Sequence, residues 1–262
     1  MRFFGKKNQA ILREMTSTDF KLRYQGSVLG YLWSLMRPIF MFLVLYLVFV
    51  VFFDVGDGVP HFEIYLLLGI VLWTFFTEVT SNGLTAIVSR GELLRKISIP
   101  RYLLVLSVSV SAFINLILNL VVVFIFALIS RVDFGWSVML LPVLIIELYA
   151  FSLALAFILS ALYVKYRDMS HIWEIIIQAA FYATPIVYPM SRAPDDFKAV
   201  ILSSPLAQII QDSRYVFVTK DTETSLSVLG LGVILPLSIV IVCCVFAYLY
   251  FHKAQRNFAE EL

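Results

Sequence analysis

Hydrophobic and polar positions follow one another in long blocks along this chain, not residue by residue. Six apolar runs cover most of the sequence, and short polar segments separate them. A helix needs about 20 apolar residues to cross the ~30 Å hydrocarbon core of a bilayer. The pattern therefore predicts an all-α membrane protein with six transmembrane helices. The runs lie at 38–53, 64–88, 102–130, 137–164, 172–190 and 226–251.

Composition supports this interpretation, and the distribution of charge predicts the orientation of the protein in the membrane. The chain is 61% hydrophobic and 15% charged, whereas soluble domains average about 25% charged residues. Of its 20 Lys and Arg residues, 15 lie in segments on the same side as the N-terminus, which places both termini in the cytoplasm. We expect a cytoplasmic N-terminal segment at 1–37, a membrane domain at 38–251 and a cytoplasmic tail at 252–262.

Three polar segments have patterns of their own. The stretch 10–25 mixes apolar and charged positions, which is typical of a helix lying on the membrane surface. The sequence of the cytoplasmic loop at 91–99 predicts a short charged helix. This helix should end before Pro100, because proline cannot continue a helix. The long outer segment 191–225 has apolar stretches too short to cross, so we expect re-entrant helices there.

Polar residues recur at helical spacing inside the apolar runs. One stripe contains Glu78 and Asn82, a second follows positions 107, 111, 115 and 119, and a third follows 174, 178 and 182. Lipid offers no water to such groups, so each stripe should face the bundle, a cavity or a partner. Two explanations remain open, namely hydrogen bonds that join helices and the lining of a transport path.

Several chemistries find no support in the sequence. No phosphate-binding G-x-x-x-x-G-K-[ST] loop and no H-E-x-x-H motif is present, and the three histidines lie far apart at loop edges. Asp195 and Asp196 form an isolated acidic pair in an outer loop. We therefore expect no catalytic residue, no metal site and no cofactor in this chain. The net charge of +2 gives no indication of nucleic-acid binding.

Four motifs resemble a known family. They are DFKLRYQGSVLGYLW…RP at 19–38, LRKISIPRY at 94–102, YRD at 166–168 and TPIVYPM at 184–190. In this order they resemble the permease subunits of ABC transporters that export polysaccharides and teichoic acids. The resemblance implies a channel-forming permease for a lipid-linked glycan such as O-antigen, capsule or teichoic acid. It also implies that ATP and Mg²⁺ bind to a separate ATPase subunit.

The resemblance further implies partners, a location and residue roles. The partners are a second copy of this chain, two ATP-binding subunits, an undecaprenyl-type lipid-linked glycan and the lipids of the bacterial inner membrane. Substrate access is expected at Arg13, Lys21, Arg23, Leu29, Gly30 and Arg37. Coupling to the ATPase is expected at Gly91, Glu92, Arg95, Lys96, Tyr166, Arg167 and Asp168. The channel or the dimer interface is expected at Glu78, Asn82, Glu174, Gln178 and Tyr182.

Two other function classes have to be weighed against this one. A membrane-embedded transferase acting on lipid-linked sugars predicts a cluster of acidic or metal-binding residues in the loops of one face. A carrier driven by an ion gradient predicts an internal repeat and a midplane ion site between broken helices. The sequence shows neither pattern, and its clearest proline breaks lie at the outer end of the fifth run.

Overall fold

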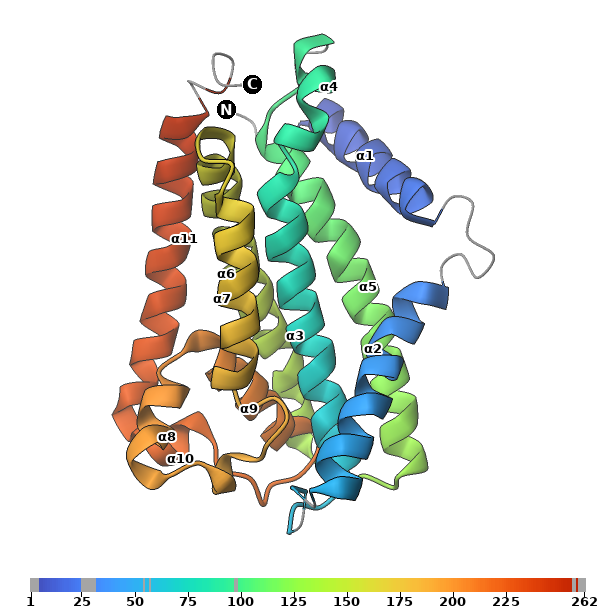
Figure 1. Cartoon of the computed structure of the whole chain (residues 1–262), viewed down its shortest axis with the longest axis vertical. Helices are drawn as coiled ribbons and strands as arrows, with labels where there is room; N and C mark the ends of the chain where they lie inside the picture. Colours follow the sequence, from blue (N-terminus) through green and yellow to red (C-terminus); the bar gives the residue numbers. More distant parts are fainter. Residues whose placement is uncertain are drawn as a thin grey trace.

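A computed structural model describes residues 5–24, 32–53, 55–56, 58–96, 99–255 and 258, with the backbone alone at 20–24, 34–35, 37, 95 and 96. This part of the chain is helical and contains no strand, as predicted. The long helices run side by side in one bundle (Figure 1). Helices α1 and α4 lie at one end of the bundle, and α8, α9 and α10 lie at the other. We call these the α4 end and the α9 end.

Among the residues that the structure describes, four helical stretches are long and apolar enough to cross a membrane, which makes this a multi-pass membrane protein. The other two predicted spans correspond to shorter helices, so the number six stays a prediction. The four stretches are α3 (Phe62–Thr85), α5 (Tyr102–Ile129), η3 with α6 (Trp136–Lys165) and α10 through α11 (Ser225–Ala254). The shorter helices are α2 (Leu32–Leu45), which continues as a π-helix at Tyr46–Phe52, and α7 (Met169–Ala183).

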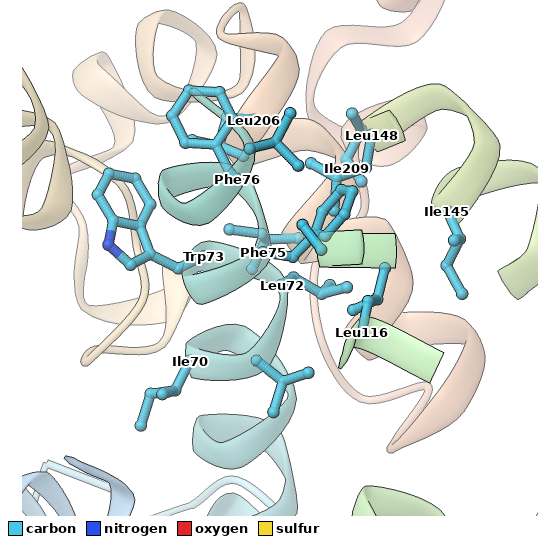
Figure 2. Close-up of a cluster of buried hydrophobic side chains, with 14 of the residues drawn as sticks. Ile70, Leu72, Trp73, Phe75, Phe76, Leu116, Ile145, Leu148, Leu206 and Ile209 are labelled. Atoms are coloured by element: carbon cyan, nitrogen blue, oxygen red, sulfur yellow. The ribbon is translucent and has the colours of Figure 1, made fainter. Parts of the chain in front are cut away.

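Helix α3 forms the centre of the bundle. In the most apolar 18-residue segment of α3, 78% of the residues are buried. The corresponding share in the Ser225–Ala254 stretch is 11%. Gly83 explains part of this burial, because a Cβ atom there would lie only 2.6 Å from that of Ala156 in α6. Figure 2 shows Leu72 and Phe75 of α3 converging with side chains from α5, α6 and α9. The apolar residues of α3 therefore hold the other helices in place.

The chain breaks at the α9 end for local reasons. Helix α7 ends at Ala183, and Thr184 is extended because the ring of Pro185 disfavours a helical residue before it. The predicted short helices of the outer segment are present as α8 (Asp195–Leu202) and α9 (Pro205–Phe217). Pro205 occupies the first turn of α9, where its missing N–H costs nothing.

Two short elements lie at the α4 end. Helix α1 (Lys6–Tyr24) confirms the helix predicted for 10–25, although it begins four residues earlier and Gln25 lies outside the described residues. The 3-10 turn η2 (Val88–Arg90) leads into α4 (Gly91–Lys96), which ends before Pro100 as predicted. Helix α1 lies diagonally against α5, and α4 lies beyond the end of α3 (Figure 1).

Candidate functional site

The polar stripe of α5 points into the protein, as predicted. Ser107, Ser111, Asn115 and Asn119 are all buried. Three of them bond to their own helix. Ser107 donates to the carbonyl of Leu104 at 2.9 Å, Ser111 to that of Ser107 at 2.9 Å and Asn119 to that of Asn115 at 2.8 Å. Asn115 also reaches α3, where its amide donates to Oε1 of Glu78 at 3.0 Å. The predicted residue Glu78 therefore joins two helices, which agrees with the first explanation of these stripes.

Ser107 belongs to a polar contact between three elements at the α4 end. The guanidinium of Arg90 in η2 bonds to the carboxylate of Asp19 in α1. It also donates to Oγ of Ser107 at 3.2 Å, and this hydroxyl lies 3.3 Å from the second carboxylate oxygen of Asp19. We call this contact the Asp19–Arg90 junction. It ties α1 and α5 to the turn that precedes α4.

A cavity of about 380 Å³ adjoins the Asp19–Arg90 junction. Six of its eight lining residues are polar, so it suits a hydrated or hydroxyl-bearing group better than a lipid tail. Asn82, predicted for the channel or the dimer interface, contributes to this cavity and lies one turn along α3 from Glu78. The lining residues are Asp19, Asn82, Thr85, Ala86, Ser89, Arg90, Val108 and Ser111.

The residues predicted to couple with the ATPase lie in two turns at the α4 end. Gly91 begins α4 and Glu92 is exposed there, while the side chains of Arg95 and Lys96 lie outside the described part of the structure. The second turn joins α6 to α7 and exposes the side chains at 166–168. Both turns lie at the same end of the bundle (Figure 1). The fold therefore offers one face for a partner that touches both.

The second turn is held by its own aromatic residues. The guanidinium of Arg167 lies over the ring of Tyr163, with its carbon 5.4 Å from the ring centroid. The ammonium of Lys165 lies 5.2 Å from the ring centroid of Tyr166. Cation–π contacts of this kind stabilise by about 0.5–1 kcal/mol at exposed sites. They keep the basic groups of the turn beside its surface, with Asp168 next to them at the start of α7.

The residues predicted for substrate access are described only in part. Arg13 is exposed on α1, and Lys21 and Arg23 belong to the same helix, but their side chains are not described. The same holds for Arg37 in α2. Leu29 and Gly30 lie outside the described residues. The structure thus places Arg13 on the surface at the α4 end and leaves the other roles as predictions.

Helix α7 has one packed face and one open face. Trp173 and Phe181 pack on α3, with ring centroids 6.3 Å from Phe76 and 5.6 Å from Trp73 respectively. The opposite face is exposed within a single chain, and Tyr182 is 69% exposed. The predicted residues Glu174 and Gln178 lie on this open face. Their polar groups are therefore available to a channel or to a second copy of the chain.

The α9 end contains a buried charge that the sequence analysis did not single out. Arg214 of α9 is completely buried and donates to three backbone carbonyls, those of Tyr65, Pro185 and Ile186. In the sequence it is one of four basic residues in the outer segment, where it has the appearance of an ordinary loop charge. The apolar residues around it, in IIQDSRYVFV, were the available signal that it is inside the protein.

A larger cavity of about 490 Å³ also lies at the α9 end, between three loop regions. Its lining combines aromatic rings, such as those of Phe134 and Tyr215, with the charged residues Asp133 and Lys220. Within the described ranges, no group of three or more His, Cys, Asp or Glu side chains comes together that could hold a metal ion. The polar features of this end include ion pairs, since Lys198 of α8 contacts both Asp195 and Glu223.

Comparison with known proteins gives these features a context. The sequence model of ABC-2 type transporters matches residues 11–218, which are most of the chain. The chain belongs to the ABC-2 type transporter family. It is accordingly a membrane permease component of a transporter and not its ATPase. The match extends from within α1 to the end of α9, so it includes the Asp19–Arg90 junction, α4 and Arg214.

Two relatives match almost from end to end. An O-antigen export system permease protein RfbA from Myxococcus xanthus is 29% identical, with 97% of this chain and 96% of the relative covered. A protein of the same name from Klebsiella pneumoniae is 27% identical, with 96% and 95% covered. The similarity therefore extends over nearly the whole length of this ABC-2 permease.

Proposed function

We propose that this chain is the channel-forming permease of an ABC exporter that carries a lipid-linked O-antigen across the bacterial inner membrane. The observation that carries the proposal is the similarity, over 96–97% of this chain, to two O-antigen export permeases. ATP and Mg²⁺ bind to a partner ATPase, because the chain has no phosphate-binding loop. Membership of the ABC-2 family favours this function over a transferase or an ion-driven carrier.

In this proposal the α4 end faces the cytoplasm. The segments predicted to be cytoplasmic carry 15 of the 20 Lys and Arg residues, as the positive-inside rule requires, and α1, α4 and the turn at 166–168 belong to these segments. The six spans are then α2 with its π-helical extension, α3, α5, α6, α7 and α11. Helix α4 and the turn at 166–168 form the docking face for the ATPase. Helices α8 and α9 are re-entrant and cap the outer side.

A second copy of the chain completes the exporter. The open face of α7 carries Glu174, Gln178 and Tyr182, and a carboxylate or amide facing lipid is costly. Pairing two copies through this face shelters the polar groups and encloses a path wider than one small bundle provides. Each copy then binds one ATPase subunit. The complex consists of two permeases and two ATPases.

The substrate enters from the inner leaflet in this proposal. The diphosphate of the lipid carrier lies at headgroup depth, where Arg13, Lys21, Arg23 and Arg37 supply positive charge. Arginine suits phosphate because its guanidinium bonds two oxygens at once. A turn is predicted at Leu29–Gly30, and there the backbone could approach the phosphates closely, since glycine has no Cβ. The polar cavity beside the Asp19–Arg90 junction lies at the same end of the molecule.

The test is to co-express this chain with a phosphate-loop ATPase from the same gene neighbourhood and to purify the complex. We expect a mass equal to two copies of each subunit and, in vesicles, ATP-dependent transfer of a lipid-linked glycan. Reversing the charges of Arg95 and Lys96 together should release the ATPase. The matched control reverses Lys220 at the α9 end, which should leave the complex intact. A single permease that transports without an ATPase would contradict the proposal.

A further inference from the structure

Arg214 is the most completely buried charge that the structure describes, and its surroundings are unusual. Its side chain has no exposed surface. Nε donates to the carbonyl of Tyr65 at 3.0 Å and Nη2 to that of Ile186 at 2.7 Å, while Nη1 bonds to the carbonyl of Pro185. Within the described residues its hydrogen-bond partners include no carboxylate. One guanidinium on α9 thus holds α3 and the segment that follows α7.

The guanidinium of Arg214 packs on the aromatic ring of Tyr65. The carbon at the centre of the guanidinium lies 3.8 Å from the centroid of the Tyr65 ring. The hydroxyl of Tyr65 donates to Oε1 of Gln211, which lies one turn before Arg214 on α9, at 2.9 Å. Gly69 lies one turn after Tyr65 on α3, and a Cβ atom there would collide with the guanidinium. Tyr65 and Gly69 therefore form a fitted site for this one side chain.

The charge makes the contact difficult to open. Arginine does not lose its proton in proteins, so the side chain remains charged when the contact opens. Separating α9 from its neighbours would leave an unpaired charge and three carbonyls in an apolar interior, and such groups are expensive to bury without partners. By contrast, α9 meets α6 mainly through apolar side chains such as those of Leu148 and Ile209, which have no directional bonds to break.

We propose that Arg214 is a positioning residue that joins α9, the end of α7 and the adjoining turns of α3 into one rigid exit unit. This inference rests on the proposed export function. The exit then opens when whole units of the two copies move apart, and α9 does not swing away from α7 within one chain. Arg214 touches no substrate in this mechanism, and it acts by fixing the helices that cap the path.

Spin-label distances within one chain test this directly. Ala183 at the end of α7 and Ser204, the exposed residue directly before α9, would be replaced by labelled cysteines after Cys243→Ala and Cys244→Ala. Labelled chains would be diluted with unlabelled ones in the complex with the ATPase. We expect the same distance distribution without nucleotide and with ATP trapped. A shift between these states would overturn the proposal, and this measurement needs no change at Arg214.

A second experiment measures how well ATP hydrolysis is coupled to glycan export in the variant Arg214→Met. Arg214→Lys serves as the conservative variant. We expect Arg214→Met to assemble and to hydrolyse ATP within about two-fold of the wild-type rate, while glycan exported per ATP falls about ten-fold. The label distribution should broaden in the same variant. Equal losses of assembly, hydrolysis and export would show a structural role only and would overturn the proposal. Absence of glycan export by the wild-type complex would instead contradict the export function, and the distance result would still stand.

Discussion

Two arginines, Arg90 and Arg214, hold opposite ends of this permease, and they do so in different ways. The side chain of Arg90 is 21% exposed, bonds to a carboxylate that is 19% exposed and lies beside a polar cavity. Arg214 has no exposed surface and bonds to carbonyls. Solvent can replace the partners of Arg90 when the contact opens, whereas nothing can replace those of Arg214.

The two arginine contacts also differ in how much free energy is lost when they are broken. Ion pairs near solvent typically stabilise by about 0–1 kcal/mol, because water and salt screen them. Removing one partner of a buried charge costs about 3–5 kcal/mol, because the remaining group stays buried without a partner. The contact at the α4 end is therefore the easier of the two to open, and the contact at the α9 end is the harder.

The largest effect should come from filling the space beside Arg214. Gly69→Ala places a Cβ against the guanidinium, and we expect it to lower the free energy of unfolding by about 1–3 kcal/mol, as overpacking does. In the background of Arg214→Met the same change should cost less than about 1 kcal/mol, because methionine is flexible and can move aside. Reversible denaturation of the four proteins of this cycle measures the difference.

Gly232 provides the matched control for that cycle. A Cβ atom at Gly232 would lie 3.4 Å from the nearest atom, which is ordinary contact, so Gly232→Ala should change the unfolding free energy by less than about 0.5 kcal/mol. Equal costs of Gly69→Ala in both Arg214 backgrounds would show that the guanidinium does not occupy this space. The contrast between the two ends would then lose its structural basis.

A smaller effect is expected at the Asp19–Arg90 junction. The cycle of Asp19→Asn and Arg90→Gln should give a coupling of about 1 kcal/mol or less in the unfolding free energy. This coupling should shrink as salt rises, because the pair is partly exposed and ions screen it. The Gly69–Arg214 coupling should not respond to salt. A salt-independent coupling at Asp19–Arg90 would mean that the two arginines are held in the same way.

The smallest effect is expected at Asp195 of α8. Its hydrogen bond to Lys198, together with the positive charge of that residue, lowers the pKa of Asp195 below 3.8. Since the folded pKa is the lower one, any stabilisation is complete above pH 3.8 and disappears as the pH falls through the lowered pKa. The carboxylate is 93% exposed, so Asp195→Asn should leave the unfolding temperature at neutral pH unchanged within error. A clear decrease would show that exposure alone does not set the strength of these contacts.

The helices were largely predictable from sequence because each apolar run or proline acts locally. The α5 stripe from Ser107 to Asn119 was placed correctly inside the bundle, since polar groups cannot face lipid. The end of α7 before Pro185 and the helices within 191–225 were also correct. These predictions need only the chemistry of neighbouring residues.

The pairing of distant charges could not be predicted in this way. Asp19 and Arg90 are 71 residues apart, and Arg214 lies 149 residues from Tyr65. Each had the appearance of a solvated charge in a polar segment, because a single sequence does not show which helices touch. The predicted roles of Glu92 and Tyr182 remain predictions for the opposite reason. Their side chains are exposed in one chain, and the partners that would cover them are separate molecules.

The sequence separation within the Asp19–Arg90 junction has a consequence for how the protein is made. Helix α1 is synthesised first, and its partner Arg90 follows 71 residues later, after α2 and α3. At roughly 5–20 residues per second, α1 waits on the order of several seconds for that partner. During this time its apolar side chains are free to rest on the bilayer surface beside the translocation machinery. The Asp19–Arg90 junction can therefore form only after α2 and α3 have been synthesised.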